Sequence, residues 1–365
     1  MSHPMNRLKR IIIENERLSL DNAESVGITD PACDVCSDLL IQSIVHGDEA
    51  EICHIVAAGA DINYCDGNDI TPLINAILLD MTDMVEVLLG LGAYSNRSAK
   101  DGITPLMHAA MRGNARVCDM LIKAGASLDA EDVMSRTALQ YACIYNQAEC
   151  VKLMLDRGAH IKRLDEKNNS LLHLCATHNA LHVTNLLANH IDLDIRNDLG
   201  HTACMTALIC GNIDVLYTLI DKGACPNIGD NMGRTLLHMT SALGDLHTSE
   251  FLVQRKCDLG SFDMYGRTAI MYSYAHRSIV ELLLDNGADP SVSDIEGYTI
   301  LDLIFIYTRG NRRKRDEYLH LIKRIILVGA TARYSSLAYD EIKILICVRM
   351  RTLIHSHKHI NTKNE

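Results

Sequence analysis

The sequence contains no tryptophan, only 3 phenylalanines and only 6 prolines among its 365 residues. A core built from it must therefore be mainly aliphatic. No uninterrupted apolar run reaches the roughly 18 residues of a membrane-spanning helix, so we expect no membrane association. The apolar run Ile11-Ile12-Ile13 is cut short by Glu14 and Glu16, which argues against a secretory signal. We expect a cytoplasmic location, with the nucleus as an alternative.

Acidic residues outnumber basic ones by 46 to 35, and the two signs are segregated along the chain. From Arg309 onward there are 13 basic and 5 acidic residues, so the rest of the chain is strongly acidic. Since nucleic-acid binding depends on basic contacts to phosphates, we expect no nucleic-acid partner. The 13 scattered cysteines fit reduced thiols better than a disulfide framework.

The sequence repeats itself at a period of about 33 residues. Each repeat has a threonine or serine that opens an apolar stretch, and we call these the mark residues: Thr71, Thr104, Thr137, Ser170, Thr202, Thr235, Thr268 and Thr299. An aspartate often stands five residues before a mark, as at Asp132 and Asp263, and a glycine two residues before it. Such registers predict a stack of similar units rather than one central core.

Each register has a physical reason. A threonine side chain accepts hydrogen bonds as a helix N-cap, and Pro72 and Pro105 stand at the first helical position, where a missing N–H costs nothing. Gly113 and Gly211 are placed to end the first helix, and a second apolar helical pattern follows. A later glycine suits a left-handed residue at the end of that second helix. The unit is therefore helix, turn, helix and a hairpin-like loop.

This pattern resembles the ankyrin repeat family, on the segments Asp101-Gly102-Ile103-Thr104-Pro105-Leu106-Met107-His108-Ala109-Ala110, Ala58-Gly59-Ala60-Asp61-Ile62-Asn63 and Gly287-Ala288-Asp289-Pro290. The resemblance implies an all-α solenoid of about nine units. It departs from the family pattern at His190 and Lys256, which replace the terminal glycine, and in a unit two residues short near His276. The last unit carries nine extra residues between its two helices.

We expect three parts: an amino-terminal arm or cap over 1–36, the repeat array over 37–330 with a basic insertion near 308–318, and a carboxy-terminal amphipathic helix with a polar tail over 331–365. The insertion contains a candidate nuclear-import cluster, for which a solvated surface is the alternative: Arg312, Arg313, Lys314 and Arg315. The carboxy-terminal pattern, from Ile342 to Ile354, suits a lid on the stack. Its segment Ile342–Arg351 also resembles the first helix of a SOCS box, which links some ankyrin-repeat proteins to a cullin ubiquitin ligase.

No segment assembles a catalytic, cofactor or metal site. Cys33 and Cys36 have metal-ligand spacing but no second pair, and His355, His357 and His359 alternate in a polar tail. Gly90-Leu91-Gly92 reads as a helix end, not as a dinucleotide loop. Walker, zincin and nucleophile-elbow motifs are absent from the sequence. We expect a protein that is not an enzyme and has no cofactor, metal or small-molecule substrate.

Residues shortly before each mark are expected at the loop tips, and those seven or eight after it toward the concave face. Many of them are apolar although no packing role requires it, which indicates a surface for another protein. The candidate binding residues are Met111, Met134, Ile144, Tyr145, Leu199, Met232 and Tyr265.

We therefore expect a non-catalytic scaffold or adaptor that binds a protein segment with apolar anchors and a basic rim. The alternative is the substrate-recognition subunit of a cullin-type ubiquitin ligase. The family resemblance also implies candidate hydroxylation of the hairpin asparagines Asn63, Asn96 and Asn227.

Overall fold

The computed structural model describes residues 31–329, with side chains from Leu39 onward. These residues form the helices α2 to α19 and contain no β-strand, only an isolated bridge between Ser293 and Thr299. The predicted all-α repeat architecture is confirmed. Residues 1–30 of the amino-terminal arm, the side chains of Cys33 and Cys36, the segment Ile342–Ile354 and the three tail histidines lie outside the described residues. Residues 31–36, which we assigned to the arm, are part of the helix α2.

The chain divides into two compact units. Within the described residues, the first contains 31–108 and Met120–Ala126, and the second contains Ala109–Asp119 and 127–329. The first unit holds α2 (Pro31–His46), α3 (Glu49–Ala57), α4 (Pro72–Leu78) and α5 (Thr82–Gly90), with parts of α6 (Pro105–Arg112) and α7 (Ala115–Lys123). In it α2 packs on α3 and α4, and α4 packs on α5.

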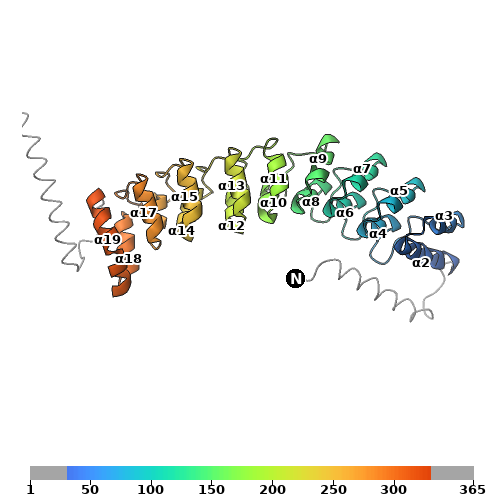
Figure 1. Ribbon diagram of the computed structural model, residues 1–365, viewed down its shortest axis with the longest axis horizontal. Coiled ribbons are helices and arrows are strands. Elements are labelled where there is room, and N and C mark those ends of the chain that lie inside the picture. The colour runs from blue at the N-terminus through green and yellow to red at the C-terminus, as the bar shows by residue number, and fades with distance from the viewer. Residues whose placement is uncertain (1–30, 330–365) are drawn as a thin grey trace, which may run out of the picture. The chain divides into compact units, whose positions relative to one another are not determined.

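The second unit is a row of helix pairs (Figure 1). Its helices are α8 (Ala138–Ile144), α9 (Ala148–Asp156), α10 (Leu171–His178), α11 (Leu181–Leu187), α12 (Ala203–Cys210), α13 (Ile213–Asp221), α14 (Leu236–Leu243), α15 (Leu246–Gln254), α16 (Ala269–Tyr272), α17 (Arg277–Asp285), α18 (Ile300–Thr308) and α19 (Arg312–Val328). First helices pack on first helices, from α8 through α10, α12, α14 and α16 to α18. Second helices pack likewise, α9 on α11, α11 on α13, α15 on α17 and α17 on α19. Each pair thus buries its apolar side against its neighbours.

The mark residues stand at the start of the first helices, and most of them cap the helix as predicted. Thr268 does not, because its buried Oγ1 has no hydrogen-bond partner among the described residues. Thr71 Oγ1 accepts from the backbone N–H of Ile74 at 3.2 Å, and Pro72 is the first residue of α4. Thr137 and Gln140 form a reciprocal capping box at α8, and Thr299 and Asp302 form one at α18. The marks themselves are buried, so each cap that forms satisfies backbone donors that water does not reach.

The predicted helix ends are also confirmed. Gly211, at a φ of 76°, follows α12 in the left-handed conformation, and α5 ends at Gly90. Where the terminal glycine is replaced by Lys256, the backbone still takes a positive φ, of 57°. A positive φ has a steric cost for lysine, whereas glycine adopts it without that cost at the equivalent position of other repeats.

The core is aliphatic, as the composition predicts. The small residues five or six after the marks are fully buried where first helices meet, as Ala142, Cys143, Cys175 and Ala176 illustrate. Among residues 31–329, no helix combines the length and the apolar character that crossing a bilayer requires.

Two units depart from the regular repeat. The short unit near His276 leaves α16 with only four residues, Ala269–Tyr272. The nine extra residues of the last unit do not form the inter-helix insertion that we predicted. They lengthen α19 to 17 residues, because Asn311 caps it by accepting from the backbone N–H of Lys314 at 3.0 Å and because arginine and lysine are good helix formers. The basic cluster is helical.

Candidate binding surface

Each loop tip of the second unit is a closed turn built on one side chain. Asp230 Oδ1 accepts from the backbone N–H groups of Met232 and Arg234, at 2.8 and 2.9 Å. The backbone N–H of Asp230 donates to the carbonyl of Arg234 at 3.0 Å. The same three bonds recur at Asp132, Asp165, Asp263 and Asp294, and with Asn197 in the aspartate's place. The tips therefore share one backbone conformation.

Backbone hydrogen bonds also join neighbouring tips. Met264 N–H donates to the carbonyl of Met232 at 2.8 Å, and Ile295 N–H donates to that of Tyr265 at 2.9 Å. A longer bond, of 3.3 Å, runs from Asn231 N–H to the carbonyl of Leu199. These bonds hold four successive tips in register and make a continuous edge of them.

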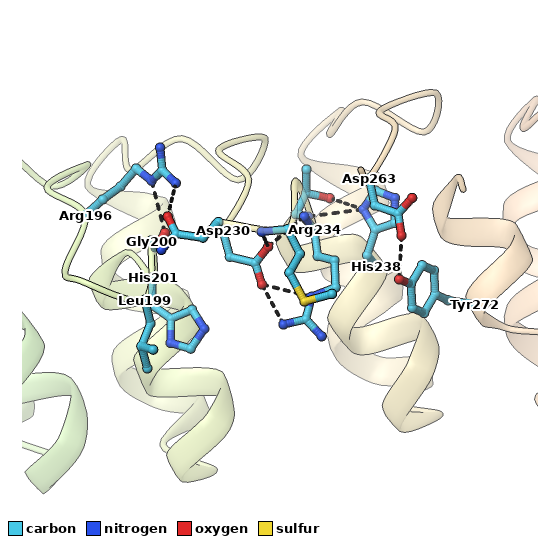
Figure 2. Close-up of polar contacts among 12 residues, drawn as sticks. Arg196, Leu199, Gly200, His201, Asp230, Arg234, His238, Asp263 and Tyr272 are labelled. Carbon is cyan, nitrogen blue, oxygen red and sulfur yellow. Dashed lines mark hydrogen bonds and ion pairs between the residues drawn. The ribbon is translucent and has the colours of Figure 1, made fainter. Parts of the chain in front are cut away.

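Side chains of the first helices support the tips from below (Figure 2). The hydroxyl of Tyr272 donates to Asp263 Oδ2 at 2.6 Å. His238 Nδ1 accepts from the backbone N–H of Thr235, so its Nε2–H donates to the carbonyl of Arg267 in the next tip, at 3.0 Å. His173 makes the equivalent bond to the carbonyl of His201, at 2.9 Å. These two histidines therefore bond to the backbone of the neighbouring loop.

Burial sets the charge state of these supporting groups. It lowers the pKa of His173 and of His238, so both imidazoles stay neutral near pH 7. Burial, with the hydrogen bond to Asp263, raises the pKa of Tyr272 to about 12. At Asp230 burial raises the pKa, but the hydrogen bonds from Arg234 and from backbone N–H groups outweigh it and leave the pKa below its usual value. Near pH 7 the two histidines and Tyr272 are therefore neutral, and Asp230 is negatively charged.

The structure places the predicted binding residues at two sites on each repeat. At the tips Met134 and Leu199 are exposed, with 59% and 63% of their surface accessible. Met232 and Tyr265 are half-buried, and the guanidinium of Arg267 lies 5.3 Å from the centre of the Tyr265 ring. At the ends of the first helices Tyr145 is exposed, while the side chains of Met111 and Ile144 are half-buried.

Further exposed apolar residues occupy the same registers. Val133, Met264 and Ile295 lie at tips, and Ile209 and Leu243 lie at first-helix ends. Sequence reasoning missed Ile306, which is 56% exposed, although its place seven residues after the mark Thr299 would have found it. It also missed the exposed Phe262, which precedes a mark by six residues and fits no register.

A family model described as ankyrin repeats, in three copies, matches residues 39–132, 80–165, 160–230 and 225–294. The chain belongs to the ankyrin repeat family. Ankyrin repeats form protein-interaction domains that are typically non-catalytic, so binding of another protein is the general function of this array.

Relatives match only part of the chain. The mitochondrial disaggregase of Bos taurus is 34% identical over 132 residues, which are 34% of this chain and 19% of that protein. The E3 ubiquitin-protein ligase hecd-1 of Caenorhabditis elegans is 28% identical over 134 residues, 35% of this chain and 5% of that protein. The crystal structure of the human ASB11 ankyrin repeat domain is 22% identical, with a TM-score of 0.48 over 54% of this chain and 89% of that one. The chain spans less than a third of the length of the curated relatives it matches.

The side chains of the hairpin asparagines form hydrogen bonds to the backbone of the next repeat. The Oδ1 atom of Asn63, which is buried, accepts from the backbone N–H of Tyr94 at 2.8 Å. Asn96 Nδ2 donates to the carbonyl of Gly125, and Asn227 Oδ1 accepts from the backbone N–H of Asp258. Hydroxylation of these residues stays a prediction. Among the described residues, no three histidine, cysteine or acidic side chains gather as metal ligands would.

Proposed function

We propose that this chain is a non-catalytic adaptor that binds a protein segment through two strips of its second unit. The tip strip consists of Val133, Met134, Leu199, Met264 and Ile295. The helix-end strip consists of Tyr145, Ile209, Leu243 and Ile306. Both strips lie within the array that we assign to 37–330.

The observation that carries this proposal is that exposed apolar side chains recur at fixed places in the repeat. Tyr145 and Leu243 both stand eight residues after a mark, and Met134 and Leu199 both stand three before one. Their neighbours in the repeat, the marks and most tip aspartates, are buried. Since exposed apolar area costs on the order of 25 cal/mol per Å², such rows favour a binding role over a folding role.

The rigidity of the tips supports the same role. Bonds within a tip and between tips fix the backbone that carries Leu199, Met264 and Ile295 before any partner arrives. A surface that is already ordered loses less conformational entropy when it binds. Methionine adapts its shape to a partner and tyrosine supplies a large contact area, so we expect apolar anchors in the partner.

The charge of the second unit indicates the rim of that partner. Before Arg309 the unit has 24 acidic and 15 basic residues. Charges around an interface steer association and select against partners of like charge. We therefore expect a segment with apolar anchors and basic flanking residues along the strips.

Two variants and a control test the proposal. Leu199→Ser with Met264→Ser and Ile295→Ser alters the tip strip, and Tyr145→Ser with Leu243→Ser alters the helix-end strip. Leu327→Ser with Val328→Ser removes exposed apolar surface outside both strips. We expect a partner captured from cell extract by the unaltered chain, and identified by mass spectrometry, to be lost with either strip variant and kept with the control. Equal capture by all three variants, with unchanged thermal unfolding, would overturn the proposal.

A second candidate function is substrate recognition for a cullin-type ubiquitin ligase. It is supported by the likeness of Ile342–Arg351 to a SOCS-box helix and by the similarity to hecd-1, whose name is that of a ubiquitin-protein ligase. Elongin and cullin should then copurify with the full chain and be lost when the chain is shortened after Ala330. Their absence from the full-length complex would remove this candidate.

A further inference from the structure

The first turn of α19 holds four consecutive cations, Arg312, Arg313, Lys314 and Arg315, and no acidic residue. The start of a helix carries a partial positive charge and favours acidic side chains. Arginine and lysine favour a helix, but glutamate does so about as well and suits this end of the helix better. Formation of α19 therefore does not call for four cations, and Asn311 already supplies the cap. The cations need another explanation.

Three cations of this region are available to a partner. Among the described residues, no carboxylate pairs with Arg309, Arg312 or Lys314. Elsewhere, arginines within or directly after a second helix pair with the preceding repeat: Arg157 with Asp119, Arg255 with Asp221 and Arg324 with Asp285. The difference indicates that these three are not used to join repeats.

Aromatic rings lie beside these cations. The ammonium of Lys314 lies 4.1 Å from the centre of the Tyr307 ring. Tyr307 in turn makes edge contacts with Tyr274 and Tyr318, with ring centres 5.7 and 5.9 Å apart. The helices α18 and α19 and the residues after α16 thus bring cations and ring surfaces together, and the exposed Ile306 stands next to Tyr307 in α18.

The charge around this patch favours one kind of ligand. Residues 309–329 contain 7 basic and 2 acidic side chains, whereas the rest of the second unit is acidic. A nucleic acid or an anionic membrane extends beyond a small patch and would meet that acidic surface. A polypeptide places a few carboxylates locally and offers apolar side chains to the rings as well.

We propose that Arg309, Arg312, Lys314 and Tyr307 bind an acidic polypeptide segment with interspersed apolar residues. The carboxylates contact the three cations, and the apolar side chains contact Tyr307 and Ile306. This proposal rests on the proposed function in one respect. Ile306 belongs to the helix-end strip, so the acidic segment would be part of the same bound partner, located at the α18 end of that strip.

The test uses the full chain and a fluorescent peptide of glutamates with interspersed leucines, followed by fluorescence anisotropy at physiological salt. We expect Arg309→Gln with Arg312→Gln and Lys314→Gln to weaken binding roughly tenfold or more. The matched control, Lys152→Gln with Lys167→Gln and Lys222→Gln, removes the same charge from exposed sites of the same unit and should keep most of the affinity. Tyr307→Leu, which keeps every charge, should weaken the leucine-containing peptide more than one of glutamate and glycine.

Three results would overturn the proposal: no binding of the peptide by the unaltered chain, equal loss in both triple variants, or tighter binding of single-stranded oligothymidine or of anionic lipid vesicles at the same patch. The helix-end variant Tyr145→Ser with Leu243→Ser separates this inference from the proposed function. It should lose the partner but keep the acidic peptide, because neither residue belongs to the patch.

Discussion

The hydroxyl of Tyr272 donates to Asp263 Oδ2 at 2.6 Å and so ties a first helix to the loop tip of its own repeat. Tyr141 and Asp132 make the same bond. In both repeats the tyrosine follows the aspartate by nine residues. The carboxylate thus serves two structures, because its other oxygen closes the tip turn. Tip geometry and helix packing are therefore coupled.

Removal of this hydroxyl should destabilise the array without removing exposed surface. Tyr272→Phe leaves Asp263 Oδ2 without its tyrosine donor, and loss of a hydrogen bond to a charged group costs about 1.5–3 kcal/mol. Urea denaturation followed by circular dichroism measures the change. The control Tyr274→Phe alters a more exposed side chain and should change the free energy of unfolding by less than about 0.5 kcal/mol. Equal effects of the two substitutions would contradict the assigned role.

The repeat at Thr104 lacks this pair and should gain stability from it. Its tip has Ala99 where other tips have aspartate or asparagine, and His108 takes the tyrosine position. Ala99 N–H donates to the carbonyl of Ile103 at 3.0 Å, as Asp263 N–H does to that of Arg267. The backbone of this tip therefore already has the conformation that the aspartate–tyrosine pair requires. We expect Ala99→Asp with His108→Tyr to raise the free energy of unfolding by roughly 1–2 kcal/mol. A double variant less stable than the unaltered chain would show that the pair does not transfer.

Acid should weaken the array before its carboxylates titrate. Burial lowers the pKa of His108 to about 4, against a partly opposing effect of Asp101, and its Nε2 has no hydrogen-bond partner among the described residues. The unfolded chain takes up this proton near pH 6.5 and the folded chain only near pH 4. Above pH 6.5 His108 is neutral in both states, and its protonation does not affect the free energy of unfolding. As the pH falls from 6.5 to 4, the unfolded chain takes up the proton and the folded chain does not, which lowers the free energy of unfolding by about 3 kcal/mol.

Urea titrations at about pH 7 and about pH 4.5 measure this loss. The variant His108→Gln cannot take up a proton, so it should lose clearly less stability between the two conditions than the unaltered chain. Burial also lowers the pKa of His173, His178, His201 and His238, which are common to both proteins and contribute to the loss that remains. If the two proteins lost stability equally, the acid sensitivity would have to come from other groups.

The regular part of the fold was predictable because its signals are local. Most mark residues cap the helix that follows them, and each such cap involves residues three positions apart, as Thr137 and Gln140 show. The spacing of nine between Asp263 and Tyr272 was equally present in the sequence, but its meaning depends on a helix and a loop folding back on each other. The predicted inter-helix insertion at Arg312–Arg315 was wrong, because an asparagine cap and helix-forming cations are enough to extend α19.

The candidate surface was predictable only in part. The register placed Tyr145 and Leu199 in exposed positions, since the repeat gives those positions no packing duty. It did not distinguish them from Met232, which is half-buried and whose carbonyl accepts the N–H of Met264. Bonds of this kind join residues about 32 positions apart through backbone atoms, which carry no sequence signature.

The bonds between tips can be tested with two glycines. Gly233 has a φ of 78°, and a Cβ added there would lie 3.1 Å from Asp263 Cα and 3.2 Å from the backbone nitrogen of Met264. Gly287 has a φ of 90°, but a Cβ there would meet nothing within 4 Å. Gly287→Ala therefore adds only backbone strain, of about 1 kcal/mol, whereas Gly233→Ala must also push the next tip away.

We expect Gly233→Ala to cost at least about 1 kcal/mol more in unfolding free energy than Gly287→Ala. It should also speed amide hydrogen exchange at Met264, because displacement of the next tip lengthens the bond from Met264 N–H to the carbonyl of Met232. Exchange at Ile295, one tip further, should change less. Equal stability of the two variants and unchanged exchange at Met264 would mean that the tips move independently, and the pre-ordered binding edge would then lose its main support.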